Sequence, residues 1–208
     1  MQQAAHGRAP AVATGIKRTR PNNTVFTYQG DGDLASIGAA EIIHAAHRGE
    51  KFTTIFGNNA IYGMTGGQYS PTTPTNEFGT TAPYGNIDKA FDIAELAGAA
   101  GATYTARGTA YHAKPLTKLI ENGIKNKGFS LVEAISICPT YYGRKNKKGD
   151  AVSMMNFLKN NAVNVKAADK LPKEKLEGKF FIGEFYNSEE PEYTAEYQKI
   201  IDSLQKER

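Results

Sequence analysis

The feature that most constrains this sequence is a pair of polar turns, each placed directly after a short apolar run. Gly30-Asp31-Gly32-Asp33 follows the first run and Asn58-Asn59 follows the second, with a helical pattern of apolar side chains over 36–48 between them. This strand–helix–strand order implies parallel strands, whose carboxyl ends meet at one sheet edge where ligands bind. Carboxylate and amide oxygens beside glycines suit a Mg²⁺ ion that carries a diphosphate.

The rest of the chain continues the alternation of strands and helices. Apolar runs predict strands near 24–28, 52–56, 103–106, 129–137 and 180–186, and helical spacing predicts helices over 36–48, 88–100, 112–126, 151–160 and 192–206. We therefore expect an α/β fold with a doubly wound, mostly parallel sheet.

The 208 residues suit a single domain over 1–208. After Pro139 the pattern changes to basic and charged loops, so residues 139–208 are interpreted as a C-terminal extension of that domain. The first predicted strand begins about twenty residues in, and the stretch from His6 to Pro10 is typical of the middle of a domain. We expect the domain to be incomplete at its amino terminus.

Each polar turn alone has an ordinary explanation. Asp31 could cap the following helix, and an Asn pair is common in turns because Asn tolerates left-handed geometry. Their occurrence at successive strand ends favours a metal site instead, with the Asp31 and Asn59 side chains and the Ile61 main-chain carbonyl as ligands. Gly30 and Gly32 would let the backbone approach the phosphate oxygens. The Gly-, Pro- and Thr-rich stretch 63–86 that follows is predicted to be a functional loop, with disorder as the alternative.

Several longer strings carry a family resemblance. They are HGRAPAVATGIKR from His6, TYQGDGDLASIG from Thr27, NNAIYGMTGGQYSPTTP from Asn58, ISICPT from Ile135 and YGRKN from Tyr142. The span from Gly30-Asp31-Gly32 to Asn58-Asn59 resembles the thiamine diphosphate motif. Together the strings resemble the beta subunit of 2-oxoacid:ferredoxin oxidoreductases, of the 2-oxoglutarate or branched-chain type, and they cover most of the chain.

The resemblance implies a thiamine diphosphate-binding fold and assigns residues to it. Asp31, Asn59 and the Ile61 carbonyl would bind Mg²⁺, while Met64 and Thr65 would face the thiazolium ring and the substrate. Relatives specialised for pyruvate have Asn where Met64 stands, which indicates another 2-oxoacid. The positions expected to bind the coenzyme are Gly30, Asp31, Gly32, Asp33, Asn59, Ile61, Tyr62, Gly63, Met64 and Thr65. His6 and Arg8 would lie near cofactor or substrate, with a surface salt bridge as the alternative.

Cys138 is the chain's one cysteine. A lone cysteine is usually a small buried hydrophobe, but the resemblance makes Cys138 the fourth thiolate of a 4Fe-4S cluster. The family's other three ligands lie in an amino-terminal Cys-Pro-x-Cys segment and a later cysteine, which this sequence lacks. One thiolate cannot hold such a cluster, so we expect a cluster only if another segment or polypeptide supplies the missing cysteines.

The implied reaction is oxidative decarboxylation of a 2-oxoacid to an acyl-CoA, with electrons passed to ferredoxin. The resemblance implies that the chain acts only together with an alpha subunit and, in some complexes, with gamma and delta subunits. It places the carboxylate that activates the coenzyme on the alpha subunit. No catalytic residue is therefore assigned in this sequence. Two alternatives stay open: a non-oxidative thiamine diphosphate-dependent decarboxylase or synthase, and a non-catalytic truncated remnant.

Charge and hydropathy limit the remaining classes. The net charge is +4, and the basic loop Arg144, Lys145, Lys147 and Lys148 is interpreted as a solvated turn or a docking site for acidic ferredoxin. No dense basic stripe or nucleic-acid motif is present, so nucleic acid is not an expected partner. No apolar run approaches the roughly 20 residues that cross a bilayer. With no signal-peptide pattern at Met1, a cytoplasmic location is expected.

Overall fold

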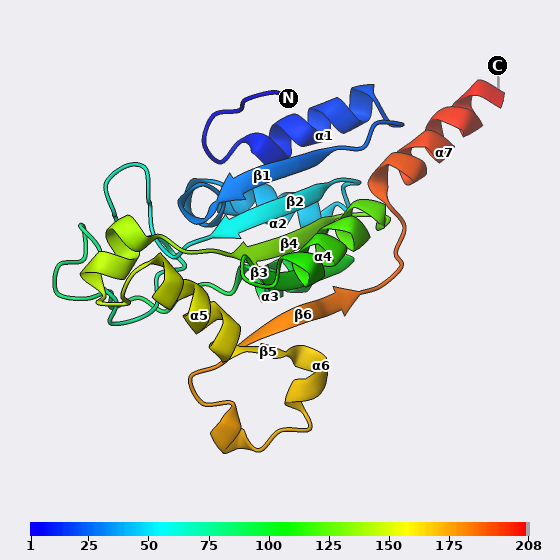
Figure 1. The fold of residues 1–208 in the computed structure, drawn as a ribbon. Coiled ribbons are helices and arrows are strands. Elements are labelled where there is room, and N and C mark those ends of the chain that lie inside the picture. The colour runs from blue at the N-terminus through cyan, green and yellow to red at the C-terminus, as the bar shows by residue number, and fades with distance from the viewer. Residues whose placement is uncertain (207–208) are drawn as a thin grey trace.

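The computed structural model describes residues 1–206 and contains one six-stranded sheet between layers of helices (Figure 1). The strands are β1 (Phe26–Gly30), β2 (Thr53–Asn58), β3 (Tyr104–Thr109), β4 (Ser130–Ile135), β5 (Ala162–Asn164) and β6 (Phe180–Asn187). Their order is β1-β2-β4-β3-β6-β5, and every neighbouring pair is parallel except β3 with β6. The expected α/β fold with a mostly parallel sheet is confirmed.

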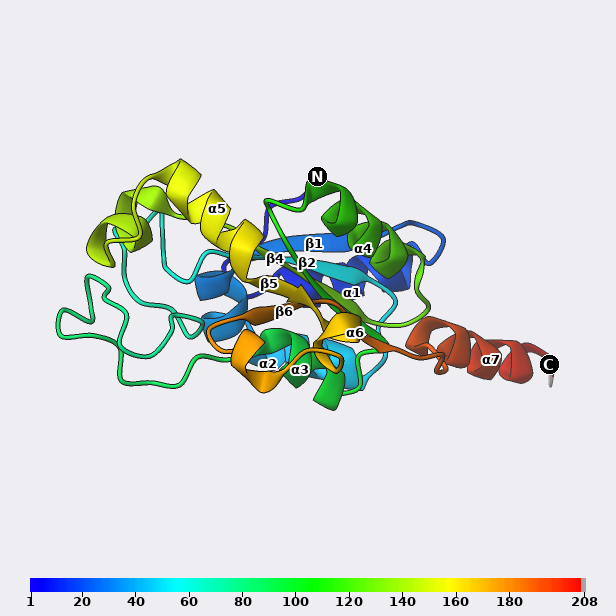
Figure 2. The same cartoon turned by 60° about the horizontal axis from the view of Figure 1, so that its bottom comes forward.

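Helices cover both faces of this sheet. The α-helices are α1 (Ala9–Thr19), α2 (Ala39–His47), α3 (Ile93–Ala99), α4 (Ala113–Lys125), α5 (Ala151–Asn161), α6 (Val165–Ala168) and α7 (Tyr193–Lys206). Three short turns of other helical types are η1 (Asp33–Ile37), η2 (Pro139–Gly143) and η3 (Lys173–Lys175). Figure 2 shows α4 on one side of the sheet and α2 and α3 on the other.

The larger core lies between the sheet and the α1–α2–α3 side. The rings of Phe52 and Phe129 meet edge to face there, 5.3 Å apart, beside the fully buried Leu34 and Ile42. A smaller cluster joins Tyr104 and its strand neighbours to the apolar stripe of α4. The helices on both faces explain why most of β3 and β4 and half of β2 are buried, including the threonines of β2 and β3.

Two helices differ from the sequence prediction. A helix starting at Asp88 is wrong, because α3 begins at Ile93 with the Asp92 side chain accepting from the Glu95 amide at 3.0 Å. The Asp88 carboxylate instead accepts from the Tyr69 hydroxyl at 3.2 Å, which ties residue 88 to the preceding loop. Helix α1 was not predicted, although a proline in its first turn and basic residues in its last are typical helix signals.

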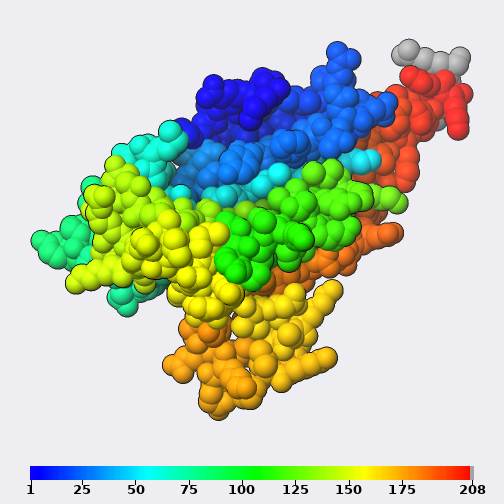
Figure 3. Space-filling view, viewed as in Figure 1, coloured from blue at the N-terminus to red at the C-terminus, as the bar shows by residue number. Residues whose placement is uncertain are grey.

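The segment after residue 139 both completes the sheet and extends from it. Its strand β6 lies antiparallel to β3, so it occupies the side of β3 that β4 leaves open. In the space-filling view, α7 and the lobe around α6 stand out from the body of the molecule (Figure 3). Within residues 1–206, no helix combines the length and apolar character needed to cross a membrane.

Candidate coenzyme site

The two predicted ligand turns lie side by side at the carboxyl ends of β1 and β2. Gly30 of β1 is in register with Gly57 of β2, so Asp31 and Asn58 leave adjacent parallel strands at the same level. The Thr72 hydroxyl lies between them, 3.2 Å from Asp31 Oδ2 and 2.9 Å from Asn58 Oδ1. The loop that follows β2 therefore returns to the strand ends and joins the two turns.

Asp31 is a buried carboxylate that has no cationic partner within residues 1–206. Only 3% of it is exposed, and its Oδ2 accepts from Ser70 Oγ at 2.5 Å and from Thr72 Oγ1 at 3.2 Å. Burial raises the pKa of Asp31, and the hydrogen bonds from Ser70 and Thr72 act in the opposite direction. A buried carboxylate stabilised only by neutral groups would gain from a bound cation.

Asn59 and Ile61 are held in a tight turn after β2. The Ile61 amide donates to Asn59 Oδ1 at 3.2 Å, and the Ala60 amide donates to Asn58 Oδ1 at 3.0 Å. Ala60 has a φ of 61°, in the left-handed region that a residue with a Cβ seldom occupies. The Thr73 hydroxyl donates to the Ala60 carbonyl at 2.6 Å, so both sides of this unusual residue are fixed.

Gly32 is in contact with Tyr62, which comes from the loop after β2. The Tyr62 hydroxyl donates to the Gly32 carbonyl at 2.9 Å, and a Cβ at Gly32 would lie 2.1 Å from the Tyr62 ring. A Cβ at Gly30 would meet no atom within 4 Å. The two glycines of the Gly-Asp-Gly turn therefore differ: the chain itself requires only the second.

The Asp33 carboxylate is occupied by the amino-terminal loop. It accepts from the Gly7 amide, and His6 Nδ1 lies 3.3 Å from its Oδ1. Arg8 forms an ion pair with Glu41 of α2. His6 and Arg8 thus lie beside the Gly-Asp-Gly turn, and Arg8 makes the salt bridge that the sequence analysis left as an alternative.

The glycine-rich loop carries Met64 and Thr65 on its outer side. Tyr62 and Gln68 pair across its base, where the Tyr62 amide donates to the Gln68 carbonyl at 2.9 Å. The Thr65 hydroxyl donates to Gln68 Oε1 at 2.7 Å, and the Met64 side chain is fully exposed. Neither of these two predicted substrate-facing side chains therefore packs into the hydrophobic core.

Cys138 lies against the same loop. It is a buried free thiol, and its Sγ would be 3.6 Å from a Cβ placed on Gly63. A Cβ on Gly67 would lie 2.7 Å from Tyr141, in the turn η2 that follows Cys138. The predicted cluster ligand and the predicted coenzyme loop thus lie next to each other, although Gly63 and Cys138 are far apart in the sequence.

A hollow of about 510 Å³ opens beside these turns. Its lining includes Tyr62, together with Ser36 from the turn after β1. The other lining residues come from the long loop before α3: Tyr69, Pro71, Asp88, Lys89 and Phe91. The hollow therefore lies between the turn after β1 and the long loop before α3.

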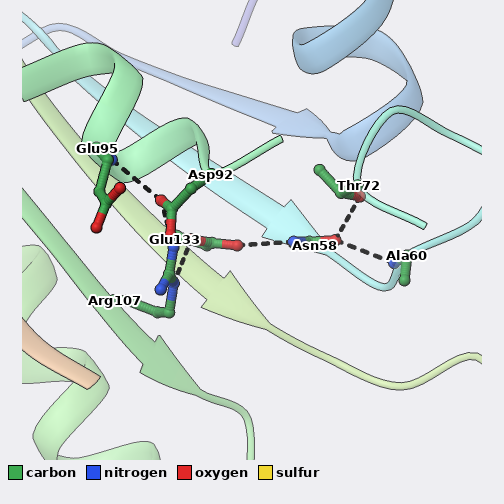
Figure 4. Close-up of polar contacts among 7 residues, drawn as sticks. All are labelled: Asn58, Ala60, Thr72, Asp92, Glu95, Arg107 and Glu133. Atoms are coloured by element: carbon green, nitrogen blue, oxygen red, sulfur yellow. Dashed lines mark hydrogen bonds and ion pairs between the residues drawn. The ribbon is translucent and has the colours of Figure 1, made fainter. Parts of the chain in front are cut away.

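A charged network lies behind the Asn58 turn (Figure 4). Glu133 of β4 accepts from Asn58 Nδ2 at 2.7 Å and from Arg107 Nε of β3 at 2.6 Å. Arg107 Nη2 also donates to Asp92 at 2.6 Å. The Asn58 turn is therefore tied to three strands and to the start of α3.

Sequence reasoning missed the supporting residues of this site. The hydroxyls of Ser70, Thr72 and Thr73 stand in a loop without periodicity, where nothing in the sequence says which of them turn inward. Glu133 carries a signal that could have been used, because it is an acidic residue within the apolar run 129–137. Charged residues in buried strands are rare unless they are paired.

Comparison with known proteins agrees with this geometry. Residues 2–134 match the family described as thiamine pyrophosphate enzyme, C-terminal TPP binding domain; thiamine pyrophosphate is another name for thiamine diphosphate. The chain is 51% identical over 197 residues to the 2-oxoglutarate synthase subunit KorB of Methanothermobacter marburgensis, covering 95% of this chain and 69% of the relative. The KorB subunit of Methanocaldococcus jannaschii is 48% identical over 202 residues, with 97% and 75% covered.

The chain belongs to the beta subunits of 2-oxoacid:ferredoxin oxidoreductases. It is a thiamine diphosphate-binding subunit of such an enzyme. The solved 2-oxoglutarate:ferredoxin oxidoreductase from Magnetococcus marinus superposes on this beta subunit with a TM-score of 0.83 and 31% identity. That superposition covers 96% of this chain and 69% of the solved one.

The beta subunit's own residues fit a hard divalent cation at Asp31. Among the described residues, no group of three or more His, Cys, Asp or Glu side chains is placed to hold a metal. The predicted ligand set is of another kind, since it combines one carboxylate with an amide oxygen and a main-chain carbonyl. The buried Asp31 carboxylate, which has no cationic partner among the described residues, is the observation that fits it.

Proposed function

We propose that this beta subunit binds Mg²⁺ and the diphosphate of thiamine diphosphate at the carboxyl ends of β1 and β2. The Asp31 carboxylate, the Asn59 side-chain oxygen and the Ile61 carbonyl would be the protein ligands of the ion. The observation that carries the proposal is the unpaired Asp31 carboxylate, buried beside the turn that presents Asn59 and Ile61. Oxygen ligands of this kind are those that Mg²⁺ prefers.

The residues around Asp31 have separate tasks in this proposal. Ser70 and Thr72 orient the carboxylate through its Oδ2, and Tyr62 fixes the backbone at Gly32. Gly30, Asp33 and Gly63 would complete the diphosphate side, with Met64 and Thr65 toward the ring and the substrate. When bound, thiamine diphosphate supplies the electron sink for loss of CO₂ from a 2-oxoacid.

The substrate we propose is 2-oxoglutarate, with coenzyme A as the acyl acceptor. The two KorB relatives compared above are named 2-oxoglutarate synthase subunits, and the solved relative is described with 2-oxoglutarate, coenzyme A and succinyl-CoA bound. A branched-chain 2-oxoacid is the second candidate, because ketoisovalerate oxidoreductase subunit VorA of Methanothermobacter thermautotrophicus is 41% identical over 169 residues. Partner subunits would include an alpha subunit and, in larger complexes, gamma and delta subunits.

The electron-transfer side of the proposal centres on Cys138. Its thiolate would be one ligand of a 4Fe-4S cluster when three further cysteines are supplied. Ferredoxin would dock on the exposed basic side chains of Arg144, Lys145 and Lys147, since the neighbouring Lys148 is paired with Glu77 at 2.7 Å. We also propose that residues 1–208 act as one coenzyme-binding domain, with 139–208 as its extension, in the cytoplasm.

The test uses the beta subunit co-produced with its partner subunits. Calorimetric titration with thiamine diphosphate should give binding that depends on Mg²⁺, and 2-oxoglutarate should reduce a viologen dye only when coenzyme A is present. Failure of the complex to bind thiamine diphosphate with Mg²⁺ would contradict the proposed site. Dye-independent release of CO₂ without coenzyme A would indicate a non-oxidative decarboxylase instead.

A further inference from the structure

A charged network lies behind the turn that presents the proposed metal ligands Asn59 and Ile61. We propose that Glu133 and Arg107 are positioning residues for the metal, because they fix the orientation of the Asn58 amide and, through it, the turn that presents Asn59 and Ile61. This proposal rests on the proposed function. Neither residue would touch the ion or the coenzyme.

The chemistry of Glu133 determines which way the Asn58 amide faces. Glu133 is 3% exposed, and its two oxygens accept from Asn58 Nδ2 at 2.7 Å and from Arg107 Nε at 2.6 Å. An ionised carboxylate can only accept hydrogen bonds, so it faces the amide nitrogen and repels the amide oxygen. The Asn58 oxygen must therefore point to the turn.

The Asn58 side-chain oxygen accepts hydrogen bonds that stabilise the turn. It accepts from the Ala60 amide at 3.0 Å and from the Thr72 hydroxyl at 2.9 Å. The left-handed backbone at Ala60 is unfavourable for a residue that has a Cβ, so the turn depends on such hydrogen bonds. Because Ala60 stands between Asn59 and Ile61, its conformation sets how the two proposed ligands converge. Thr72 extends the same chain of contacts to Asp31 Oδ2, 3.2 Å away.

Arg107 holds the Glu133 carboxylate in place through the oxygen that does not face Asn58. The two residues are directly opposite each other in the β3–β4 register, and Arg107 also pairs with Asp92. Burial alone would lower the pKa of Arg107, but the charges of Glu133 and Asp92 outweigh it and raise that pKa. The network thus runs from β3 across β4 to the end of β2 and on to Thr72 (Figure 4). The Thr72 hydroxyl then links it to Asp31 in the turn after β1.

Glu133→Gln is the discriminating variant, because glutamine has only one side-chain oxygen. If that oxygen stays on Arg107, the Gln amino group faces Asn58, and the Asn58 amide must flip and turn its own nitrogen toward Ala60. The double variant N58D/E133Q should repair this. An aspartate at position 58 accepts from the Gln amino group with one oxygen and from Ala60 and Thr72 with the other.

The matched control is Glu50→Gln. Glu50 is also fully buried and accepts from two arginines, Arg18 at 2.6 Å and Arg48 at 2.9 Å. It lies before the amino end of β2, at the opposite end of the strand from Asn58. Its substitution therefore removes a comparable buried charge without touching the ligand turn.

The experiment measures binding of thiamine diphosphate to the complete complex, calorimetrically, over a series of Mg²⁺ concentrations. We expect E133Q to raise the half-saturating Mg²⁺ concentration about tenfold or more, as loss of an outer-shell partner does. At saturating Mg²⁺, its affinity for the coenzyme should return to that of the wild type. E50Q should leave the Mg²⁺ dependence unchanged, and N58D/E133Q should restore it.

Three outcomes would overturn the proposal: an unchanged Mg²⁺ dependence in E133Q, an equal shift in E50Q, or no recovery in the double variant. If E133Q alone does not assemble, N58D/E133Q is compared with N58D, in which two carboxylates face each other. The double variant must then bind at lower Mg²⁺ than N58D, and equal or weaker binding refutes the role of Glu133. A wild-type complex that shows no Mg²⁺-dependent binding would refute the proposed function itself.

Discussion

The two ends of the parallel sheet each bury a carboxylate, but they treat its charge in opposite ways. At the amino end, Glu50 is fully buried and pairs with Arg18 and Arg48. At the carboxyl end, Asp31 is nearly as buried, but it accepts from the hydroxyls of Ser70 and Thr72 and has no cationic partner among the described residues. The contrast favours a structural role for Glu50 and, for Asp31, the cation-binding role proposed above.

Glu133 shows that the carboxyl end does not lack cations in general. It lies behind the same strand ends and is paired with Arg107. The absence of a cation next to Asp31, within the described residues, is therefore local to one carboxylate. This contrast gives the predictions below, ordered from the largest expected effect to the smallest.

Replacing the unpaired carboxylate should have the largest effect. Asp31→Asn keeps the size of the side chain but removes the negative charge. We expect Mg²⁺-dependent thiamine diphosphate binding to fall by more than the roughly 100-fold that loss of an outer-shell partner gives. Calorimetry on the complex measures this.

The stability of Asp31→Asn tests whether the charge of Asp31 destabilises the folded chain. Because burial raises the pKa of Asp31, the ionised group costs the folded chain free energy at neutral pH, and the coenzyme-free variant should not melt below the wild type. Retained coenzyme binding, or a lower melting temperature, would contradict the assignment of Asp31 as a functional charge.

The paired carboxylate should give the reverse result. Glu50→Ala leaves Arg18 and Arg48 without their shared partner. We expect the free energy of unfolding to fall by about 2–3 kcal/mol, less than the roughly 3–5 kcal/mol of a fully buried pair because both arginines stay partly exposed. Urea unfolding measures the loss, and coenzyme affinity should not change. A loss of affinity as large as that of Asp31→Asn would remove the distinction between the two ends.

Gly32→Ala should have the next largest effect. Its Cβ would lie 2.1 Å from the Tyr62 ring, so Tyr62 must move and its hydrogen bond to the Gly32 carbonyl is lost. We expect a cost of about 1–3 kcal/mol, as for other overpacked sites, together with weaker coenzyme binding. Gly15→Ala in α1 is the matched control: no atom lies within 4 Å of its Cβ, and it should stabilise the helix by roughly 0.5–1 kcal/mol.

Gly30→Ala should have the smallest effect on the chain itself. No atom lies within 4 Å of the added Cβ, so the free energy of unfolding should change by no more than about 0.5 kcal/mol. Any fall in coenzyme affinity would then report how closely the diphosphate approaches β1. Equal thermal destabilisation by Gly30→Ala and Gly32→Ala would show that contact with Tyr62 does not decide the glycine requirement.

The sequence predicted the parts of the site that follow from strand order. Apolar runs place Asp31 and Asn58 after consecutive strands, and parallel pairing then makes them neighbours. The loop hydroxyls could not be predicted in the same way, because a segment without periodicity does not indicate which side chains turn inward. Strands β3 and β4 are also consecutive and parallel, but the Arg107–Glu133 pair depends on their exact register, which no local pattern in the sequence specifies.

The antiparallel strand β6 also has a consequence for how the chain folds during synthesis. Strands β1, β2, β3 and β4 are complete by residue 135, but β3 acquires its second neighbour only from residues 180–187. Until the ribosome has released that segment, one side of β3 offers unpaired backbone groups to any other strand. Truncations before residue 180 should therefore aggregate during expression, even though they retain every residue of the candidate coenzyme site.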